Sequence, residues 1–179
     1  MIYLIRHGEA AASWGSHPDP GLSDAGRMQA DAVAQALLSE PISRAITSPM
    51  ARCQETASYF ADASRLELTI QPAVTEIPTP SDVTDRVPWL RGLMSGQWSD
   101  VPDLVKDWRN GLIDTLKALP DQTIVFTHFV AVNAIVGSIE GTGNVTVFRP
   151  NYCSVTKLDN TSGALRLVER GQSLETKVL

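Results

Sequence analysis

Four stretches of the chain have the length and the apolar pattern of β-strands. Residues 2–5 form an unbroken run of β-branched, aromatic and leucine side chains, and residues 123–127 have the same character. Runs of this kind are typical of parallel strands that are buried on both faces of a sheet. Residues 45–47 predict a short second strand. Residues 66–71 alternate apolar and polar positions, which indicates a strand nearer an edge of the sheet.

Apolar residues with helical spacing fill much of the chain between and after these strands. The four expected helices run from Ser23 to the stop at Glu40-Pro41, from Ser48 to about Ala63, from Ser99 to the stop at Pro120-Asp121, and onward from near Val130. Serine is a good N-cap residue, because its hydroxyl accepts a hydrogen bond from an amide of the first turn. Ser48 is followed by Pro49, and proline is favoured at the first helical position.

The order of these elements predicts an α/β fold. Strands separated by helices become parallel neighbours through right-handed crossovers, so we expect a three-layer α/β/α sandwich with a mostly parallel central sheet. Short strands at 146–149, 153–158 and 164–169 are expected to add antiparallel neighbours. We expect one domain over residues 1–179, in which the irregular segment 74–100 caps a substrate site.

Composition and charge exclude some classes of partner. The chain has 179 residues, a net charge of −5 and an isoelectric point of about 5.1, which argues against a general surface for nucleic acids or anionic membranes. The two cysteines, Cys53 and Cys153, lack the spacing of a metal site and are expected to be reduced thiols. We see no targeting segment and no apolar run long enough to span a bilayer, so we expect a cytoplasmic protein.

Chemically reactive side chains follow three of the expected strands. In chain order they are Arg6, His7, Ser48, Arg52 and His128. Parallel strands bring their carboxyl ends to one edge of the sheet, where ligands of open α/β sheets bind. Helix N-termini favour anions, and guanidinium groups match the oxygens of phosphate. The sequence therefore predicts a site for a tetrahedral oxyanion, bound as part of a small phosphorylated substrate.

These residues and their neighbours resemble the histidine phosphatase superfamily, the phosphoglycerate mutase-like group. The similar segments occur in the family's order over nearly the whole chain: Ile5-Arg6-His7-Gly8-Glu9, Gly21-Leu22-Ser23 with Gly26 and Gln29-Ala30, Ser48-Pro49-Met50-Ala51-Arg52-Cys53-Gln54-Glu55-Thr56-Ala57, Thr127-His128 and Asn151-Tyr152-Cys153-Ser154-Val155. An Arg-His-Gly triplet alone is a weak signal. The combination with the second arginine segment and a strand-terminal histidine is specific, and it implies the phosphoglycerate mutase-like fold.

The resemblance also implies catalytic and phosphate-binding roles, and no metal or cofactor. His7 would be the nucleophile that accepts the phosphoryl group as a phosphohistidine. Arg6, Arg52 and His128 would hold the phosphoryl oxygens, with His128 also counted as catalytic. Glu76 is the best match for the acid that protonates the leaving oxygen and later activates water. The chemistry agrees, because a nucleophilic imidazole must be neutral and nearby arginines push its pKa in that direction.

Two expected phosphate-binding residues depart from the family pattern. An ungapped comparison places Ala12-Ser13 where the family often has Trp-Asn, so Ser13 would offer phosphate only a hydroxyl. Phe129 follows His128 where glycine is usual. Its backbone amide can still face a phosphate, provided that the ring lies elsewhere.

The segment after Glu76 also departs from the family. Asp82 and Asp85 therefore remain alternatives for the acid. Arg86 and Arg91 lie in the same irregular region, and we hypothesise that they select the substrate.

We predict a metal-independent phosphatase that hydrolyses a small phosphate monoester. The alternatives are a protein phosphohistidine phosphatase and an inactive phosphate-binding module of the same fold. Mutase activity is disfavoured by the short chain and by the absence of a Trp-Glu-Gly stretch after Glu76. A metallophosphatase is disfavoured because the three histidines show no paired ligand spacing. The substrate and the oligomeric state stay open at this stage.

Overall fold

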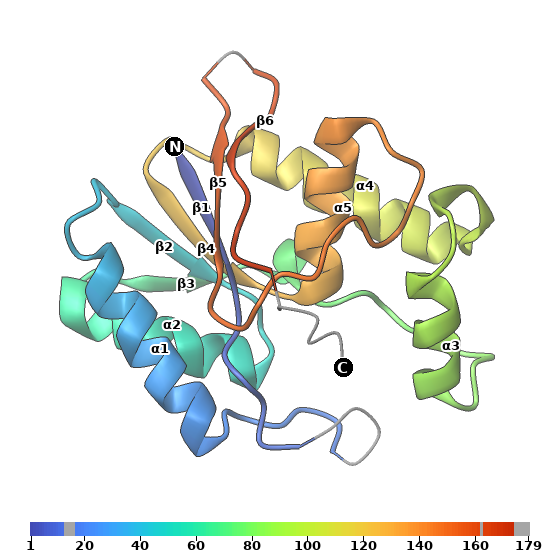
Figure 1. The fold of residues 1–179 in the computed structure, drawn as a ribbon, viewed down its shortest axis with the longest axis horizontal. Coiled ribbons are helices and arrows are strands. Elements are labelled where there is room, and N and C mark those ends of the chain that lie inside the picture. The colour runs from blue at the N-terminus through green and yellow to red at the C-terminus, as the bar shows by residue number, and fades with distance from the viewer. Residues whose placement is uncertain (13–16, 162, 174–179) are drawn as a thin grey trace, which may run out of the picture.

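A mixed six-stranded sheet forms the centre of the part of the chain that the computed structural model describes, residues 1–12, 17–161 and 163–173 (Figure 1). The strands are β1 (Ile2–Arg6), β2 (Arg44–Thr47), β3 (Leu68–Ile70), β4 (Thr123–Thr127), β5 (Val155–Asp159) and β6 (Arg166–Glu169), in the order β3-β2-β4-β1-β5-β6. The pairs β3-β2, β2-β4 and β4-β1 are parallel, and β5 and β6 continue the sheet as antiparallel strands. The predicted α/β fold and the antiparallel tail are confirmed.

Helices cover both faces of this sheet. They are α1 (Asp24–Leu37), α2 (Ala51–Ser64), α3 (Arg86–Met94), α4 (Asp103–Ala118) and α5 (Phe129–Glu140), with short 3-10 turns η1 (Pro72–Val74) and η2 (Trp98–Asp100). Figure 1 shows α1 and α2 side by side on one flank of the sheet, with α4 and α5 on the other and α3 beyond them. The arrangement is the expected helix–sheet–helix sandwich.

The first strand shows why an unbroken apolar run suits this position. Side chains of a strand point alternately to its two faces. Ile2 and Leu4 belong to the core that α4 and α5 complete, whereas Tyr3 and Ile5 pack into the core beneath α1 and α2. All four side chains are buried, so both faces of this part of β1 are covered by helices.

The strand expected at residues 146–149 is absent, and a buried amide explains its absence. Asn133 of α5 directs Oδ1 toward this segment and accepts hydrogen bonds from the backbone amides of Val147 and Phe148, at 2.8 and 3.1 Å. The amides that a strand would pair with a neighbour are therefore satisfied by a helix side chain.

The irregular segment before α4 also differs in detail from the sequence-based expectation. The helix expected from Ser99 begins as the 3-10 turn η2, and α4 itself begins at Asp103, after Pro102. The irregular segment also contains the helix α3, where the Asp85 carboxylate caps the N-terminus by accepting the Val87 amide at 3.1 Å.

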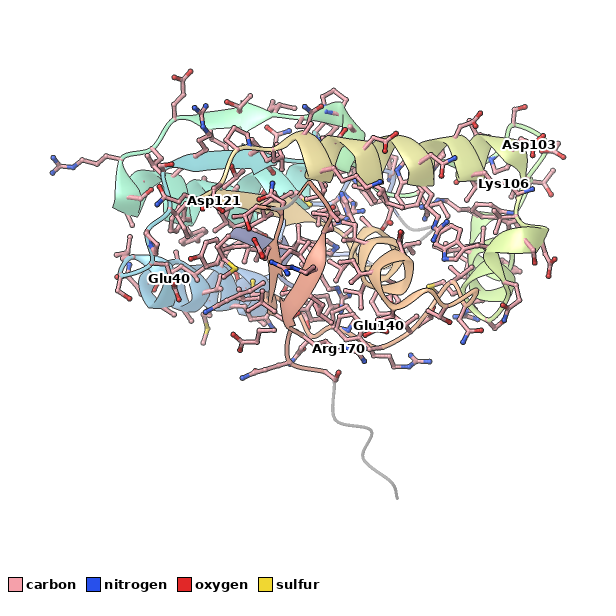
Figure 2. The ribbon with its side chains drawn as sticks, turned by 90° about the horizontal axis from the view of Figure 1, so that it is seen from above. Glu40, Asp103, Lys106, Asp121, Glu140 and Arg170 are labelled. Atoms are coloured by element: carbon pink, nitrogen blue, oxygen red, sulfur yellow. The ribbon has the colours of Figure 1, made fainter. Side chains whose placement is uncertain are left out.

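Charged pairs lie at the periphery of the molecule (Figure 2). Asp103 and Lys106 approach to 3.5 Å on α4, and Arg170 pairs with Glu140 beside α5. Exposed pairs of this kind contribute about 0 to 1 kcal/mol each, so burial of the two cores is the main stabilising term. Among the described helices, none has both the length and the apolar character needed to cross a membrane.

Candidate functional site

The carboxyl ends of three neighbouring strands bring the predicted residues together. Arg6 at the end of β1 is in register with Thr127 at the end of β4, and the His7 amide donates to the Thr127 carbonyl oxygen at 3.0 Å. The Ser48 amide likewise donates to the carbonyl oxygen of Phe126 at 3.0 Å. The turns after β1, β2 and β4 therefore lie side by side at one edge of the sheet.

Backbone contacts fix the position and the tautomer of His7. Its Nδ1 lies 2.7 Å from the carbonyl oxygen of Gly8, which can only accept, so Nδ1 carries the proton. In a neutral imidazole Nε2 is then left with its lone pair, and it accepts a hydrogen bond from Arg52 Nε at 3.2 Å. Gly8 itself is required here, because a Cβ on it would meet the carbonyl oxygen of Gly26 at 2.7 Å.

The guanidinium of Arg52 joins the two histidines. Its Nη2 donates to Nδ1 of His128 at 3.1 Å, so the proton of that ring sits on Nε2, which donates to Ser48 Oγ at 2.7 Å. The ring centroids of His7 and His128 are 5.3 Å apart. Residues separated by more than a hundred positions in the chain thus share one hydrogen-bonded network.

Burial and the neighbouring cations keep both imidazoles neutral. Burial lowers the pKa of His7 from 6.5 to about 3, and the charges of Arg52 and Arg6 act in the same direction. The pKa of His128 is also held well below its ordinary value, first by burial and then by His7 and Arg52. A neutral ring with a free lone pair is the form of histidine that acts as a nucleophile.

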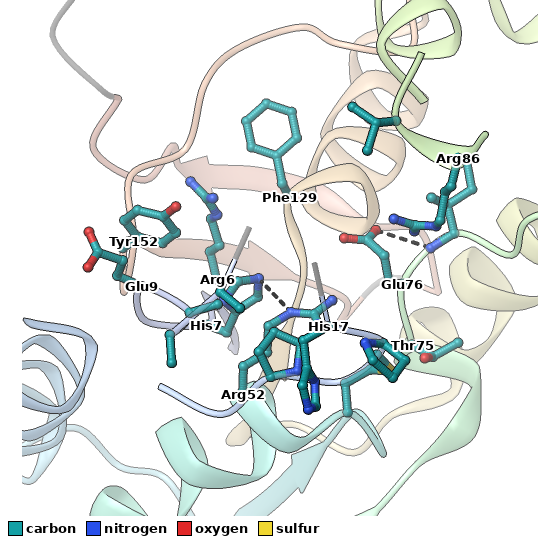
Figure 3. A pocket seen from close by; sticks show the side chains of 18 of the residues that line it. Arg6, His7, Glu9, His17, Arg52, Thr75, Glu76, Arg86, Phe129 and Tyr152 are labelled. Atoms are coloured by element: carbon teal, nitrogen blue, oxygen red, sulfur yellow. Dashed lines mark hydrogen bonds between the residues drawn. The ribbon is translucent and has the colours of Figure 1, made fainter. Parts of the chain in front are cut away.

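Arg6 is held between two aromatic rings. The carbon of its guanidinium lies 4.0 Å from the ring centroid of Tyr152 and 5.2 Å from that of Phe129. Its Nη1 donates to the carbonyl oxygen of Pro150 at 2.8 Å. Cation–π contacts and one backbone acceptor therefore fix the guanidinium in the site. Figure 3 shows the Phe129 ring directed away from His7, so this departure from the family pattern does not crowd the imidazole.

Glu76 reaches the same network from the segment after β3. Thr127 Oγ1 donates to the Val74 carbonyl oxygen at 2.7 Å, which ties this segment to β4. The carboxylate of Glu76 accepts the Ile77 amide at 3.1 Å, and its other oxygen lies 3.7 Å from His128 Nδ1. Burial raises the pKa of Glu76, although the Ile77 hydrogen bond and the nearby arginines oppose this change. A raised pKa suits a carboxyl group that must deliver a proton.

Several of these groups line a cavity of about 910 Å³ (Figure 3). The predicted residues on its wall are Arg6, His7, Arg52, Glu76 and Phe129. His128 is fully buried behind Arg52 and does not line the cavity. Ser13 lies outside the described residues. The alternative acids Asp82 and Asp85 are exposed and are not on the cavity wall.

The N-terminus of α2 is built differently from the prediction. The helix begins at Ala51, and Met50 in the N-cap position makes no side-chain capping bond. Ser48 is not the cap: its Oγ accepts from His128 and from the Met50 amide, the latter at 3.2 Å. The carboxylate of Asp19, from the loop after β1, accepts the Ala51 amide at 2.9 Å and supplies the cap.

Tyr152 and Asp19 are site residues that the sequence reasoning missed. Tyr152 lines the cavity as well as stacking on Arg6, and Asp19 lies 3.8 Å from Nη1 of Arg52. In the part of the chain that is described, no three His, Cys, Asp or Glu side chains gather in the manner of a metal ligand set.

Comparisons with known proteins identify the family of the chain. A model of the histidine phosphatase superfamily (branch 1) matches residues 2–173. A protein named probable phosphoglycerate mutase GpmB from Yersinia enterocolitica is 25% identical over 182 residues, which cover 89% of this chain and 84% of that protein. The protein of the same name from Photorhabdus laumondii is 26% identical with the same coverage.

Solved structures share the fold. Bacillus stearothermophilus YhfR superposes with a TM-score of 0.79 at 18% identity, over 97% of each chain. A phosphoserine phosphatase from Entamoeba histolytica, in complex with 3-phosphoglyceric acid, has a TM-score of 0.74 at 20% identity, again over 97% of each chain. At these identities the likeness establishes the architecture.

Proposed function

Since the chain belongs to the histidine phosphatase superfamily (branch 1), we propose that it hydrolyses a small phosphate monoester through a phosphohistidine on His7. One observation carries the proposal. The unprotonated Nε2 of His7 faces the same cavity as two guanidiniums and a buried carboxyl group of raised pKa. This combination supplies the nucleophile, the stabilising charge and the acid of a phosphoryl transfer.

In the first step the lone pair of His7 Nε2 attacks phosphorus, and the bond from phosphorus to the ester oxygen breaks. The proton of the Glu76 carboxyl group passes to that oxygen, which leaves as an alcohol. Arg6 and Arg52 stabilise the charge on the three equatorial oxygens. Since Arg52 Nε donates to His7 Nε2 in the structure, it must transfer this hydrogen bond to a phosphoryl oxygen before the attack.

In the second step a water molecule attacks phosphorus and the bond to His7 Nε2 breaks. The Glu76 carboxylate takes the proton of the water, so one group serves as acid and then as base. Inorganic phosphate leaves, and His7 returns to the neutral ring whose Nδ1 proton the Gly8 carbonyl has held throughout.

The burial of His7 favours a small substrate over a folded phosphoprotein. The residue is only 6% exposed, so a phosphoryl group must enter the cavity to reach Nε2. A phosphohistidine on a protein surface would have to project an entire side chain into this space.

The direct test is turnover of p-nitrophenyl phosphate by the wild type, His7→Ala and His17→Ala, each with and without EDTA. His17 is an exposed histidine at the cavity wall and provides the matched control. We expect EDTA-resistant turnover by the wild type and the control, and none above background by His7→Ala. Acid-labile, alkali-stable labelling of His7 by a phosphorylated substrate would identify the covalent intermediate. Equal rates for wild type and His7→Ala would reject the proposal, and phosphate binding without turnover in any variant would favour the inactive module.

A further inference from the structure

The cavity has more positive charge than a phosphoryl group requires. Four arginines line it: Arg6, Arg52, Arg86 and Arg91. The chain as a whole has a net charge of −5, so this concentration of cations is local. Arg6 and Arg52 already match the charge of about −2 that a phosphate monoester carries near neutral pH.

The carboxylates on the cavity wall do not balance the remaining cations. They belong to Glu9 and Glu76. Glu9 accepts a hydrogen bond from Ser23 Oγ at 2.7 Å, which directs it to the start of α1. Burial favours the neutral form of Glu76, through its raised pKa. The Asp19 carboxylate approaches Arg52, at 3.8 Å, and not the remaining two arginines. The guanidiniums of Arg86 and Arg91 are therefore not balanced by these carboxylates.

Arg86 and Arg91 both belong to α3 and both line the cavity. Figure 3 shows Arg86 beyond Glu76 as seen from His7. Nε of Arg86 donates to Thr79 Oγ1 at 2.8 Å, which fixes the side chain. The two Nη groups of the guanidinium remain able to donate to another acceptor. Among the described residues neither arginine has a carboxylate within 4.0 Å. Arginine forks of this kind bind planar or tetrahedral anions more specifically than lysine does.

The cavity is also larger than a phosphate needs. A volume of about 910 Å³ lies at the upper end of the range for sites that enclose a drug-sized molecule. A phosphoryl group at His7 fills one end of this space and leaves the α3 side for the remainder of the substrate.

We propose that Arg86 and Arg91 form a second anion-binding subsite, so that the preferred substrate is a phosphate monoester with a further carboxylate or phosphate. The identity of the bound molecule as a substrate rests on the proposed phosphatase function. Binding of the second anion does not, because the subsite and His7 are on different sides of the cavity.

The test measures binding to His7→Ala by calorimetry, which makes the result independent of turnover. The first ligand pair is 3-phosphoglycerate and glycerol 3-phosphate, in which a carboxylate replaces a hydroxymethyl group. The second pair is propane-1,3-diol bisphosphate and propyl phosphate. We expect the partner with the second anionic group to bind about tenfold more tightly in at least one pair, which is the effect of one charge-assisted hydrogen bond. The pair with the larger ratio identifies the anion.

Added to His7→Ala, the substitutions Arg86→Gln and Arg91→Gln should together reduce this ratio to less than about threefold, and Arg86→Lys should retain part of it. The matched control is Arg44→Gln, which removes an exposed arginine at the amino end of β2, the opposite edge of the sheet. It should preserve the ratio. Equal affinities within both pairs, or a ratio unchanged by the double substitution, would overturn the subsite even if the wild type proves to be an active phosphatase. Conversely, a ratio that depends on Arg86 and Arg91 in a protein without phosphatase activity would reject only the catalytic proposal.

Discussion

Folding removes the His7 imidazole from water, and this makes the stability of the protein depend on pH. Burial lowers the pKa of this residue from 6.5 to about 3 in the folded protein. At pH values between these two pKa values, His7 binds a proton in the unfolded chain but not in the folded protein. The free energy of unfolding must therefore fall as the pH falls through this window.

The magnitude follows from the two pKa values of His7. Each pH unit over which only the unfolded chain holds the proton costs about 1.4 kcal/mol, and integration between about pH 7.5 and 5 gives a loss of about 2 kcal/mol from this residue alone. His128 acts in the same direction, because burial also lowers its pKa. Glu76 acts in the opposite direction: its raised pKa lets the folded protein take up a proton before the unfolded chain does.

Urea unfolding at a series of pH values, followed by circular dichroism, separates these contributions when the wild type is compared with His7→Gln. Both proteins keep buried His128 and Glu76, so the difference between their unfolding free energies reports the removal of His7 and of its effect on the His128 pKa. Between pH 7.5 and 5, we expect the free energy of unfolding of the wild type to fall by about 2 kcal/mol relative to that of His7→Gln. His17→Gln, which removes an exposed histidine, should follow the wild type throughout. A difference that stays flat across the window would refute the claim that the folded protein holds His7 neutral, and with it the basis of the proposed nucleophile.

Substitutions at three further positions test other contacts of the site. Tyr152→Leu removes the ring 4.0 Å from Arg6 and should raise KM about fivefold with little change in kcat, whereas Tyr152→Phe should stay within about twofold of the wild type. Asp19→Ala removes the acceptor of the Ala51 amide and should lower the free energy of unfolding in urea by about 1 kcal/mol, as loss of a helix cap does. Glu76→Gln should slow single-turnover release of the alcohol from an alkyl phosphate by about a hundredfold but affect release of nitrophenolate from p-nitrophenyl phosphate far less, because nitrophenolate leaves without a proton. An equal loss for both esters would contradict its role as the acid.

The sequence predicted the parts of the fold whose cause is local or periodic. The doubly buried strand at residues 2–5 and its partner at 123–127 were recognisable because both faces of each strand meet a helix layer. The failures have non-local causes. In residues 146–149, the backbone amides of Val147 and Phe148 donate to the side-chain oxygen of Asn133 instead of to a neighbouring strand. The sequence of this segment does not indicate that partner. Ser48 has the local pattern of an N-cap, but its hydroxyl is taken by His128 from another strand end.

The same distinction applies to the residues of the site. His7, Arg52 and His128 follow predicted parallel strands, so topology alone brings them to one edge. Tyr152 precedes an antiparallel strand, and the amino end of such a strand meets the carboxyl ends of its parallel neighbours. The register of Val155 with Ile5 shows this directly. The predicted antiparallel strand in the tail was therefore sufficient to place Tyr152 near the site. Asp19 had no such signal, because its loop position follows from no periodic pattern.

The two arginines next to His7 are held in different ways, and the difference has a consequence for the proposed reaction. The Arg6 guanidinium lies between the Tyr152 and Phe129 rings, and these contacts do not involve the lone pair of His7. Arg52 instead donates to the two imidazoles, including the lone pair of His7 Nε2 that must attack phosphorus. A phosphoryl group can be attacked only after it has taken over that hydrogen bond. Substrate binding and release of the nucleophile are then the same event, so the lone pair becomes available when a phosphoryl group is in place to receive it.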